Sequence, residues 1–160
     1  MAALQTTEYR NARAIGLLVF FLVLVLGVGS TIGVLTAPSD WFASLAKPPF
    51  NPPNWVFAPV WFTLYVLIAL AGWRTFLQAP TSPQMWLWAG QMALNWLWSP
   101  TWFTLHLLWP AFVVLVLMLV LGFIAVSWRR DRVASGLFIP YAAWVVFAGL
   151  LNFSIALLNP

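Results

Sequence analysis

The chain of 160 residues contains no cysteine and very little charge. The lack of cysteine excludes disulfides, thiolate metal sites and a cysteine nucleophile. Charged residues make up 6% of the chain, whereas a soluble domain carries about a quarter. Seven Lys and Arg against three Asp and Glu leave a net charge of +4. So few cations form no basic face, and a nucleic-acid-binding protein is therefore excluded.

Residues that carry acid–base or metal chemistry are equally scarce. The three acidic residues, Glu8, Asp40 and Asp131, lie outside the apolar runs, and no two of them form an acid/base pair. We therefore predict no metal site and no catalytic residue. His106 is the only histidine and lies near the end of an apolar run, where an ordinary hydrogen-bonded role is favoured over ligation of a haem iron.

Long apolar runs take the place of charge. Hydrophobic residues make up 63% of the chain, with a mean hydropathy of +0.92, and a chain this short has too little interior to hide them from water. The runs are continuous, without the alternation of a membrane-spanning barrel. We therefore predict one all-α membrane domain over residues 1–160 with five transmembrane helices, at about residues 14–35, 55–77, 84–107, 110–128 and 133–158.

The basic residues fall almost entirely on one side of such a bundle. With five spans, the N-terminus and the loops after the second and fourth helices share a side, and Lys47 alone lies on the other. The cations on the shared side are Arg10, Arg13, Arg74, Arg129, Arg130 and Arg132. This is the positive-inside pattern, so we predict a multi-pass protein whose N-terminus is cytoplasmic. The short cluster at residues 129–132 is interpreted as a topology determinant rather than a lipid-binding site.

The connection at residues 36–54 is stiff and aromatic. Six of the 12 prolines lie between Pro38 and Pro59, and proline prevents regular helix there; before them, Ser39 and Asp40 favour the start of a short helix. Such a segment suits a shaped lid at the mouth of the bundle or an anchor in the headgroup zone, and the two roles are compatible. The residues assigned to the lid are Trp41, Lys47, Pro52, Pro53 and Trp55.

Three of the predicted helices carry faces on which aromatic and polar residues recur at helical spacing. Such faces favour a pocket for a flat apolar ligand with polar edges, but aromatic side chains also fill space between helices, and a buried amide also joins helices. Periodicity alone leaves both interpretations open. The faces are Ala58, Trp61 and Tyr65; Trp88, Gln91, Asn95, Trp98 and Trp102; and Trp144, Phe147, Ala148, Leu151 and Ile155, with Asn152 at the edge.

Two pairs of small residues at a spacing of four indicate close helix packing. Gly29 and Gly33 form one pair, and Ala89 and Ala93 form the other. Small residues let helix backbones approach closely in a membrane. The pairs serve either packing within the bundle or the seam of a homodimer.

Several motifs, taken together, resemble the TspO/translocator protein family, which comprises the tryptophan-rich sensory proteins of bacteria and the peripheral benzodiazepine receptor of mitochondria. The resemblance covers nearly the whole chain after the first dozen residues. The motifs are Trp41-Phe42-x-x-Leu45-x-Lys47-Pro48, Pro52-Pro53-x-Trp55-Val56-Phe57-x-Pro59-Val60-Trp61-x-x-Leu64-Tyr65, Gly90-Gln91-x-Ala93-Leu94-Asn95-x-x-Trp98-x-Pro100 and Pro140-Tyr141-x-x-Trp144-x-x-Phe147-Ala148-x-x-Leu151-Asn152.

The resemblance implies a five-helix bundle, usually a homodimer, with a cavity beneath the first loop. It implies a membrane receptor or sensor that binds tetrapyrroles, notably protoporphyrin IX or a haem-like ligand, and synthetic benzodiazepine or isoquinoline carboxamide ligands, with no obligatory cofactor. A light-dependent porphyrin-degrading enzyme and a carrier of porphyrin or sterol are the alternatives. Carried over by position, the cavity residues are Trp61, Asn95, Trp98, Trp144, Phe57, Ala58, Ala148 and Leu151.

The chain departs from the animal members of this family. Residues 152–160 contain neither the tyrosine nor the basic residue of their cholesterol-recognition stretch. The position in the first loop that is often Trp is Phe50. The chain therefore resembles a bacterial member, for which we expect a location in the cell membrane.

Overall fold

The computed structural model describes residues 2–127 and 131–160, and every regular element within them is helical. These ranges contain six α-helices, one more than the five predicted spans, because the connection between the first two long helices includes a short helix of its own. The elements are α1 (Ala2–Leu35), α2 (Asp40–Ser44), the 3₁₀ turn η1 (Asn54–Val56), α3 (Phe57–Gln78), α4 (Pro83–Ser99), the π-helical turn η2 (Pro100–Thr104), α5 (Leu108–Ser127) and α6 (Arg132–Leu158).

Three of these segments are long and apolar enough to cross a membrane. They are residues 11–35 in α1, residues 54–78 in η1 and α3, and α6. The apolar part of α5, Leu108–Ile124, is shorter, and α4 has 17 residues. By length and composition, the described chain is therefore an all-helical membrane protein with three clear spanning segments.

Two helix boundaries differ from the sequence prediction by more than two residues. α1 begins at Ala2 rather than at residue 14, because charged residues mark the edge of an apolar run and do not end the helix itself. α4 ends at Ser99 rather than at residue 107. Pro100 has no N–H with which to continue the α-helical hydrogen bonds, and the Leu105 N–H donates to the Pro100 carbonyl, five residues back, at 2.9 Å.

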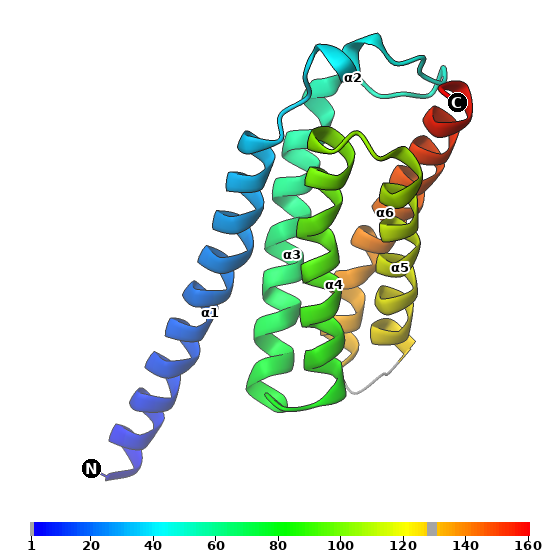
Figure 1. Cartoon of the computed structure of the whole chain (residues 1–160). Coiled ribbons are helices and arrows are strands. Elements are labelled where there is room, and N and C mark those ends of the chain that lie inside the picture. Colours follow the sequence, from blue (N-terminus) through cyan, green and yellow to red (C-terminus); the bar gives the residue numbers. More distant parts are fainter. Residues whose placement is uncertain (1, 128–130) are drawn as a thin grey trace.

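The long helices lie side by side, and one end of the bundle is covered (Figure 1). α1 packs against α3, which also packs against α6, while α5 packs against both α4 and α6. α2 and the rest of the connection between α1 and α3 cover the end at which the C-terminus lies, and the N-terminus lies at the other end. The Pro-rich connection at residues 36–56 therefore covers the interior of the bundle at this end. We call this connection the roof.

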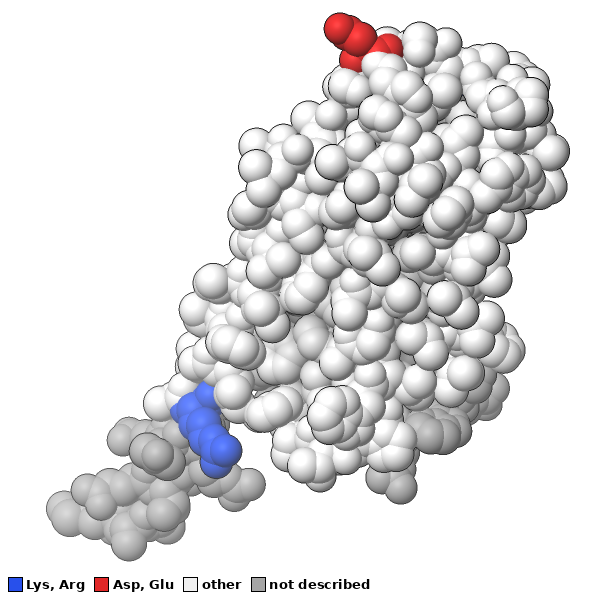
Figure 2. Space-filling view, in the orientation of Figure 1, with Lys and Arg blue, Asp and Glu red and all other residues white. Residues whose placement is uncertain are grey.

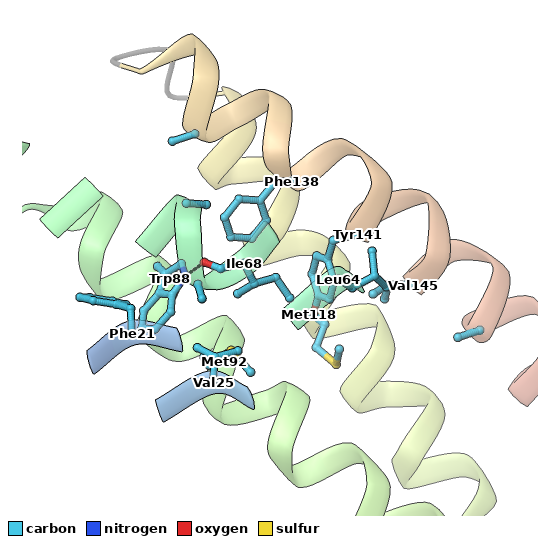
Figure 3. Packing of buried hydrophobic residues seen from close by; sticks show 14 of the residues in the cluster. Phe21, Val25, Leu64, Ile68, Trp88, Met92, Met118, Phe138, Tyr141 and Val145 are labelled. Atoms are coloured by element: carbon cyan, nitrogen blue, oxygen red, sulfur yellow. Dashed lines mark hydrogen bonds between the residues drawn. The ribbon is translucent and has the colours of Figure 1, made fainter. Parts of the chain in front are cut away.

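The lower part of the bundle in Figure 1 has a solid core. Apolar side chains from five helices meet there, including Val25, Ile68, Met92 and Met118 (Figure 3). The Trp88 Nε1–H donates to the Ile68 carbonyl at 3.0 Å. Opposite this indole ring α3 has Gly72, where a Cβ atom would clash with the ring. Helices α3 and α4 therefore approach closely at this level.

The described charged side chains lie at the two ends of the bundle. Figure 2 shows a face with a basic group near one end, an acidic group at the other end and no described charge between them. The side chain of Arg10 and the whole of Arg129 and Arg130 lie outside the part that the structure describes. This separation of the charges is what a membrane-spanning bundle requires, because an ionised group in the hydrocarbon region is costly.

Asp131 joins α3 to α6 at the end of the bundle that is opposite α2. Its carboxylate accepts from Arg74 Nε at 2.9 Å and from Gln78 Nε2 at 2.6 Å, and it caps α6 by accepting from the N–H groups of Val133 and Ala134. Burial alone raises the pKa of Asp131, but the hydrogen bonds from Arg74, from the two backbone N–H groups and from Gln78 outweigh it and lower the pKa below its ordinary value.

Candidate ligand-binding site

A cavity of about 490 Å³ lies between the helices beneath the roof. Its walls come from α1, α3, α4 with η2, and α6, and the connection after α1 closes its upper side. The volume lies within the range of about 300–1,000 Å³ that is usual for small-molecule sites. The lining residues are Gly29, Ser30, Ile32, Gly33, Val34, Thr36, Pro38, Phe42, Asn54, Phe57, Ala58, Trp61, Phe62, Tyr65, Asn95, Trp98, Ser99, Trp102, Phe103, Ala148, Leu151, Asn152 and Ile155.

The lining is aromatic and carries no ionisable charge. Among the residues that the structure assigns to the cavity there is no Asp, Glu, Lys, Arg or His. No group of three or more potential metal-ligating side chains occurs in the described residues. The cavity therefore suits an apolar guest held by stacking and by a few hydrogen bonds.

Seven of the eight residues predicted for the cavity line it. Phe57, Ala58 and Trp61 lie on α3, where spacings of three and four residues place side chains on one helix face. The same spacing brings Asn95 and Trp98 together on α4. The α6 wall contributes Ala148 and Leu151.

Trp144 is the eighth residue, and it lies behind the wall. Its ring contacts Phe57 at 5.9 Å and Phe147 at 5.3 Å between centroids, and it is not among the lining residues. Its Nε1–H is buried without a hydrogen-bond partner among the described residues. The Phe57 ring, which does line the cavity, covers Trp144, and a helical wheel of α6 alone does not show this.

A buried polar network adjoins the cavity at Asn95. Tyr141 is 1% exposed, and its hydroxyl accepts hydrogen bonds from the side-chain amides of Gln91 and, at 3.4 Å, Asn95. The Asn95 side chain is buried and lines the cavity, and its Oδ1 has no partner in the described part of the chain. An unpaired acceptor in so apolar a place costs free energy, so Asn95 is the natural partner for a hydrogen-bond donor on a guest.

Asn152 holds the opposite wall together. Its Nδ2 donates to the Leu108 carbonyl at 3.0 Å, and its Oδ1 lies 3.5 Å from Trp98 Nε1. Both ends of this amide therefore already have protein partners. Asn152 therefore links α6 to Leu108 and to the Trp98 indole ring and, unlike Asn95, has no buried polar atom without a partner in the described part of the chain.

The roof contacts the cavity through residues other than those assigned to the lid. Phe42, which is 5% exposed, lines the cavity together with Pro38 and Asn54, which are themselves exposed. The five residues assigned to the lid do not line it. Of these, Trp41 stacks on His106 at 4.0 Å, Lys47 Nζ lies 4.7 Å above the Phe42 ring, Pro52 is half-buried, and Pro53 and Trp55 are exposed.

Two sets of hydrogen bonds fasten the roof to the helices. Thr36 and Ser99 share a hydroxyl–hydroxyl bond of 2.6 Å between the ends of α1 and α4. The Asn159 amide makes a reciprocal pair with the backbone of Ala46, both bonds being 3.0 Å long. The roof is therefore attached to both α4 and α6, and we call the Ala46–Asn159 pair the roof clasp.

The four small residues that were predicted to pack have different surroundings. Gly29 lies against the ring of Tyr65, so it lets α1 approach α3. At Gly33, no atom of the described residues lies within 4 Å of the position that a Cβ would occupy. Ala89 is half-buried and Ala93 is exposed. Only Gly29 and Ala89 thus face other helices within the described part of the chain.

Sequence reasoning missed the α1 wall and part of η2. From residue 14 onward α1 is almost entirely apolar and has no distinct polar or aromatic stripe, so its sequence does not mark residues 29–36 as a wall. Phe62 and Phe103 were missed as well. Trp102 belongs to the predicted α4 face, and the wide turn of η2 keeps it on the cavity side.

These features define an all-helical membrane protein with an uncharged, aromatic cavity inside the bundle. The model of the TspO/MBR family matches residues 20–158. The chain belongs to this family. It is 37% identical to the protein CrtK of Rhodobacter capsulatus over 80% of this chain and 84% of that one.

Further relatives come from bacteria and from animals. The chain is 35% identical to the tryptophan-rich sensory protein of Cereibacter sphaeroides over 83% of this chain and 85% of that one. It is 40% identical to the translocator protein of Ovis aries over 71% of each chain. The matches therefore cover most of each relative.

Proposed function

We propose that this protein is a membrane receptor or sensor that binds a flat, largely apolar ligand of the tetrapyrrole class, such as protoporphyrin IX, in the cavity beneath α2. The observation that carries the proposal is the cavity of about 490 Å³ lined by aromatic rings from several helices. The names of the relatives, tryptophan-rich sensory protein and translocator protein, support a sensing or receptor role.

The chemistry of the lining favours a particular orientation of such a ligand. Aromatic walls stack on a planar ring, and the unpaired Asn95 Oδ1 accepts from an N–H or O–H group. The lining offers no cation, and an unpaired carboxylate is expensive to bury. The propionates of protoporphyrin IX would therefore lie at the mouth of the cavity, while its apolar edge enters first.

A titration of protoporphyrin IX into the protein in lipid nanodiscs tests the proposal. The readout is the shift of the porphyrin absorption band, which does not depend on how many tryptophans a variant retains. We expect Asn95→Ala to weaken binding by about 1–1.5 kcal/mol, roughly tenfold in Kd. We expect Trp98→Phe to weaken it by about 0.5–1.5 kcal/mol.

Trp86→Phe is the matched control, because Trp86 lies on the same helix and is 73% exposed. Its affinity should equal that of the unchanged protein. Equal affinities for all of these proteins would contradict the site, and no band shift with the unchanged protein would contradict the tetrapyrrole class.

The proposal includes five membrane crossings with the N-terminus in the cytoplasm. α4 with η2 and α5 lie alongside the three clear spanning segments. Because the chain has no cysteine, single cysteines at Thr81 and Ala43 report the two ends of the bundle. A membrane-impermeant maleimide added to intact cells should label Ala43→Cys and not Thr81→Cys, and the reverse pattern would invert the topology.

The proposal also includes a homodimer in the membrane. Ala93 is exposed, so it leaves room for the backbone of a second copy. Ala93→Leu should lower the dimer fraction in nanodiscs, as measured by single-molecule photobleaching. Val113→Leu, at an exposed position of α5, should not lower it. A dimer fraction that Ala93→Leu leaves unchanged would contradict a dimer interface at Ala93.

A further inference from the structure

The lining of the cavity is exposed on the side formed by α1 and α3. The lining residues of α4, η2 and α6 are buried or half-buried, whereas several of those on α1 and α3 are exposed. Val34 is 76% exposed and Phe62 is 59% exposed. The cavity therefore has a lateral opening where α1 packs against α3, and we call this opening the window. The exposed residues around it are Ser30, Gly33, Val34, Ala58 and Phe62.

The window lies within the membrane-spanning part of the bundle. Its two sides belong to the spanning segments at residues 11–35 and 54–78. Phe62 lies about two helical turns into the second segment, roughly 12 Å along the axis. The exposed Pro38 and Asn54 of the roof also line the cavity and form its upper edge. The window therefore faces the headgroups at its upper edge and the hydrocarbon region of the bilayer below.

A shallow apolar groove on α1 continues from the cavity. It has a volume of about 460 Å³ and shares Ile32 with the cavity lining. From Ile32 to Phe20 it extends for about 18 Å along the helix axis. Gly27 lies in the middle, and no described atom is within 4 Å of the position that its Cβ would occupy. We call this feature the α1 groove. Its lining residues are Phe20, Val23, Leu24, Gly27, Val28, Thr31 and Ile32.

The surroundings of the α1 groove suit an apolar chain. The only side-chain hydroxyl in its lining belongs to Thr31, and it donates to the Gly27 carbonyl at 2.8 Å. α1 lies at the edge of the bundle (Figure 1), so the groove faces the bilayer. The dimer interface proposed above lies at Ala93 on α4, and a second copy placed there leaves the groove uncovered.

We propose that the site takes flat ring ligands that carry a long apolar chain, such as a tetrapyrrole esterified with an isoprenoid alcohol. The ring lies in the cavity, and the chain leaves through the window and lies along the α1 groove. The inference rests on the proposed function, because it needs the ring in that cavity. It narrows the class of ligand from flat rings in general to rings with a membrane-embedded chain.

The chemistry of the ligand agrees with this arrangement. In the orientation proposed above, the edge of the ring that carries the propionates lies at the mouth of the cavity, so an ester chain on this edge begins at the window. An ester is neutral, whereas an ionised carboxylate is costly at the depth of the hydrocarbon region. An enclosed cavity of about 490 Å³ would have to hold both the ring and the chain, but the window lets the chain stay outside.

The test compares methyl pheophorbide with pheophytin, two neutral ligands with the same ring. One ester group of this ring carries a methyl group in the first ligand and a phytyl chain in the second. The full chain is reconstituted in lipid nanodiscs, and binding is read from the shift of the ring absorption band as the mole fraction of ligand in the lipid is raised. We expect the two affinities to agree within about threefold, because lipid and groove are equally apolar surroundings for the chain.

Gly27→Leu tests the place of the chain by filling the α1 groove. Gly16→Leu is the matched control, because Gly16 is exposed on the same helix and lies outside the groove. At both positions the Cβ has open space among the described atoms, so the fold should be retained. Gly27→Leu should lower the affinity for pheophytin, relative to that for methyl pheophorbide, by about threefold or more, since packing contacts hold the chain in the groove. Gly16→Leu should leave this ratio unchanged.

The outcomes separate this inference from the proposed function. Binding of methyl pheophorbide without binding of pheophytin would overturn the inference and leave the flat-ligand site intact. A ratio that Gly27→Leu leaves unchanged would overturn the α1 groove as the place of the chain. If neither ligand shifted its absorption band, both the inference and the proposed site would be overturned.

Discussion

The lower half of the bundle in Figure 1 has a closely packed core and a pocket of only about 50 Å³, whereas the half beneath α2 contains the cavity of about 490 Å³, although the same long helices form both. We call the lower half the solid half and the other the hollow half. In the solid half, α3 presents Ala69, Ala71 and Gly72, and the indole of Trp88 packs against them. In the other half, α3 presents Phe57, which contacts the Trp144 ring of α6, and Trp61, which contacts the Trp98 ring of α4.

The difference shows that aromatic residues alone do not make a cavity. A large ring opposite small residues fills the space between helices, as Trp88 does with its N–H satisfied by Ile68. Beneath α2, the rings of Trp61 on α3 and Trp98 on α4 contact each other instead, with their centroids 6.3 Å apart. The close approach of a ring to a glycine is therefore found in the packed half, at Trp88 and Gly72.

Substitution of one glycine in each half should give the largest difference in stability between the two halves. A Cβ at Gly72 clashes with the Trp88 ring, which is buried and hydrogen-bonded and so cannot move aside. Gly72→Ala should lower the free energy of unfolding by about 1–3 kcal/mol. A Cβ at Gly29 clashes with Tyr65, but that ring is half-buried at the cavity and has room to turn, so Gly29→Ala should cost clearly less.

Thermal unfolding in detergent, followed by circular dichroism, measures both variants. Gly16→Ala is the control: no described atom lies within 4 Å of its Cβ position, and alanine should stabilise the helix by about 0.5–1 kcal/mol. Equal losses for Gly72→Ala and Gly29→Ala would mean that the two halves are packed alike.

The border between the halves depends on the Tyr141 hydroxyl. Tyr141→Phe leaves the buried Gln91 and Asn95 amides without their shared acceptor, so we expect a loss of about 1–3 kcal/mol in unfolding free energy. Tyr65→Phe is the same substitution at a half-buried residue of the cavity wall, and it should stay within about 0.5 kcal/mol of the unchanged protein. A Tyr141→Phe variant as stable as Tyr65→Phe would show that the network adds nothing.

The sequence predicted the cavity faces of α3, α4 and α6 better than the rest of the site. On α4, Asn95 and Trp98 stand out against an apolar background, so helical spacing assigns them to one face. α1 lacks such contrast, and its wall became visible only in the packed structure. A face could be predicted where polar or aromatic residues stand out from an otherwise apolar helix, and hydrophobicity by itself did not identify one.

The errors have an equally physical origin. Spacing on α6 places Trp144 toward the interior. Whether a ring from another helix lies against it depends on tertiary packing, and here the Phe57 ring of α3 does, with the centroids 5.9 Å apart. In the Pro-rich connection, the sequence shows where a helix cannot continue and not which ring points inward. Phe42 lines the cavity, whereas Trp41 lies on His106.

The Asp131 contacts should make the stability of the solid half depend on pH. Because the folded-state pKa of Asp131 is lowered, the carboxylate contributes stability above its unfolded pKa of about 3.9, and this contribution is lost as the pH falls from there through the folded pKa. Asp131→Asn keeps a helix cap and loses the ion pair with Arg74, which is worth about 0–1 kcal/mol near the surface.

Melting temperatures measured from neutral pH down through this acidic range compare Asp131→Asn with the unchanged protein. The difference between them should shrink as the carboxylate is protonated. Asp40→Asn, at the exposed carboxylate in the roof, is the control for the removal of one negative charge. A gap between Asp131→Asn and the unchanged protein that stays constant with pH would assign the loss to packing rather than charge.

The smallest effect on stability is expected at the roof clasp, and it should be confined to the hollow half. Asn159→Ala removes both bonds to the Ala46 backbone, but these lie at the exposed end of α6, so unfolding should change by less than about 1 kcal/mol. Hydrogen exchange at the Ala46 amide should rise, and a ligand in the cavity should dissociate faster, because local opening of the roof becomes easier.

Ser44→Ala removes only a bond within α2, to the Trp41 carbonyl, and should leave both rates unchanged. If Asn159→Ala altered exchange equally at the Met92 amide in the solid core, the roof and the core would open as one unit, and the distinction between the two halves would not extend to their dynamics.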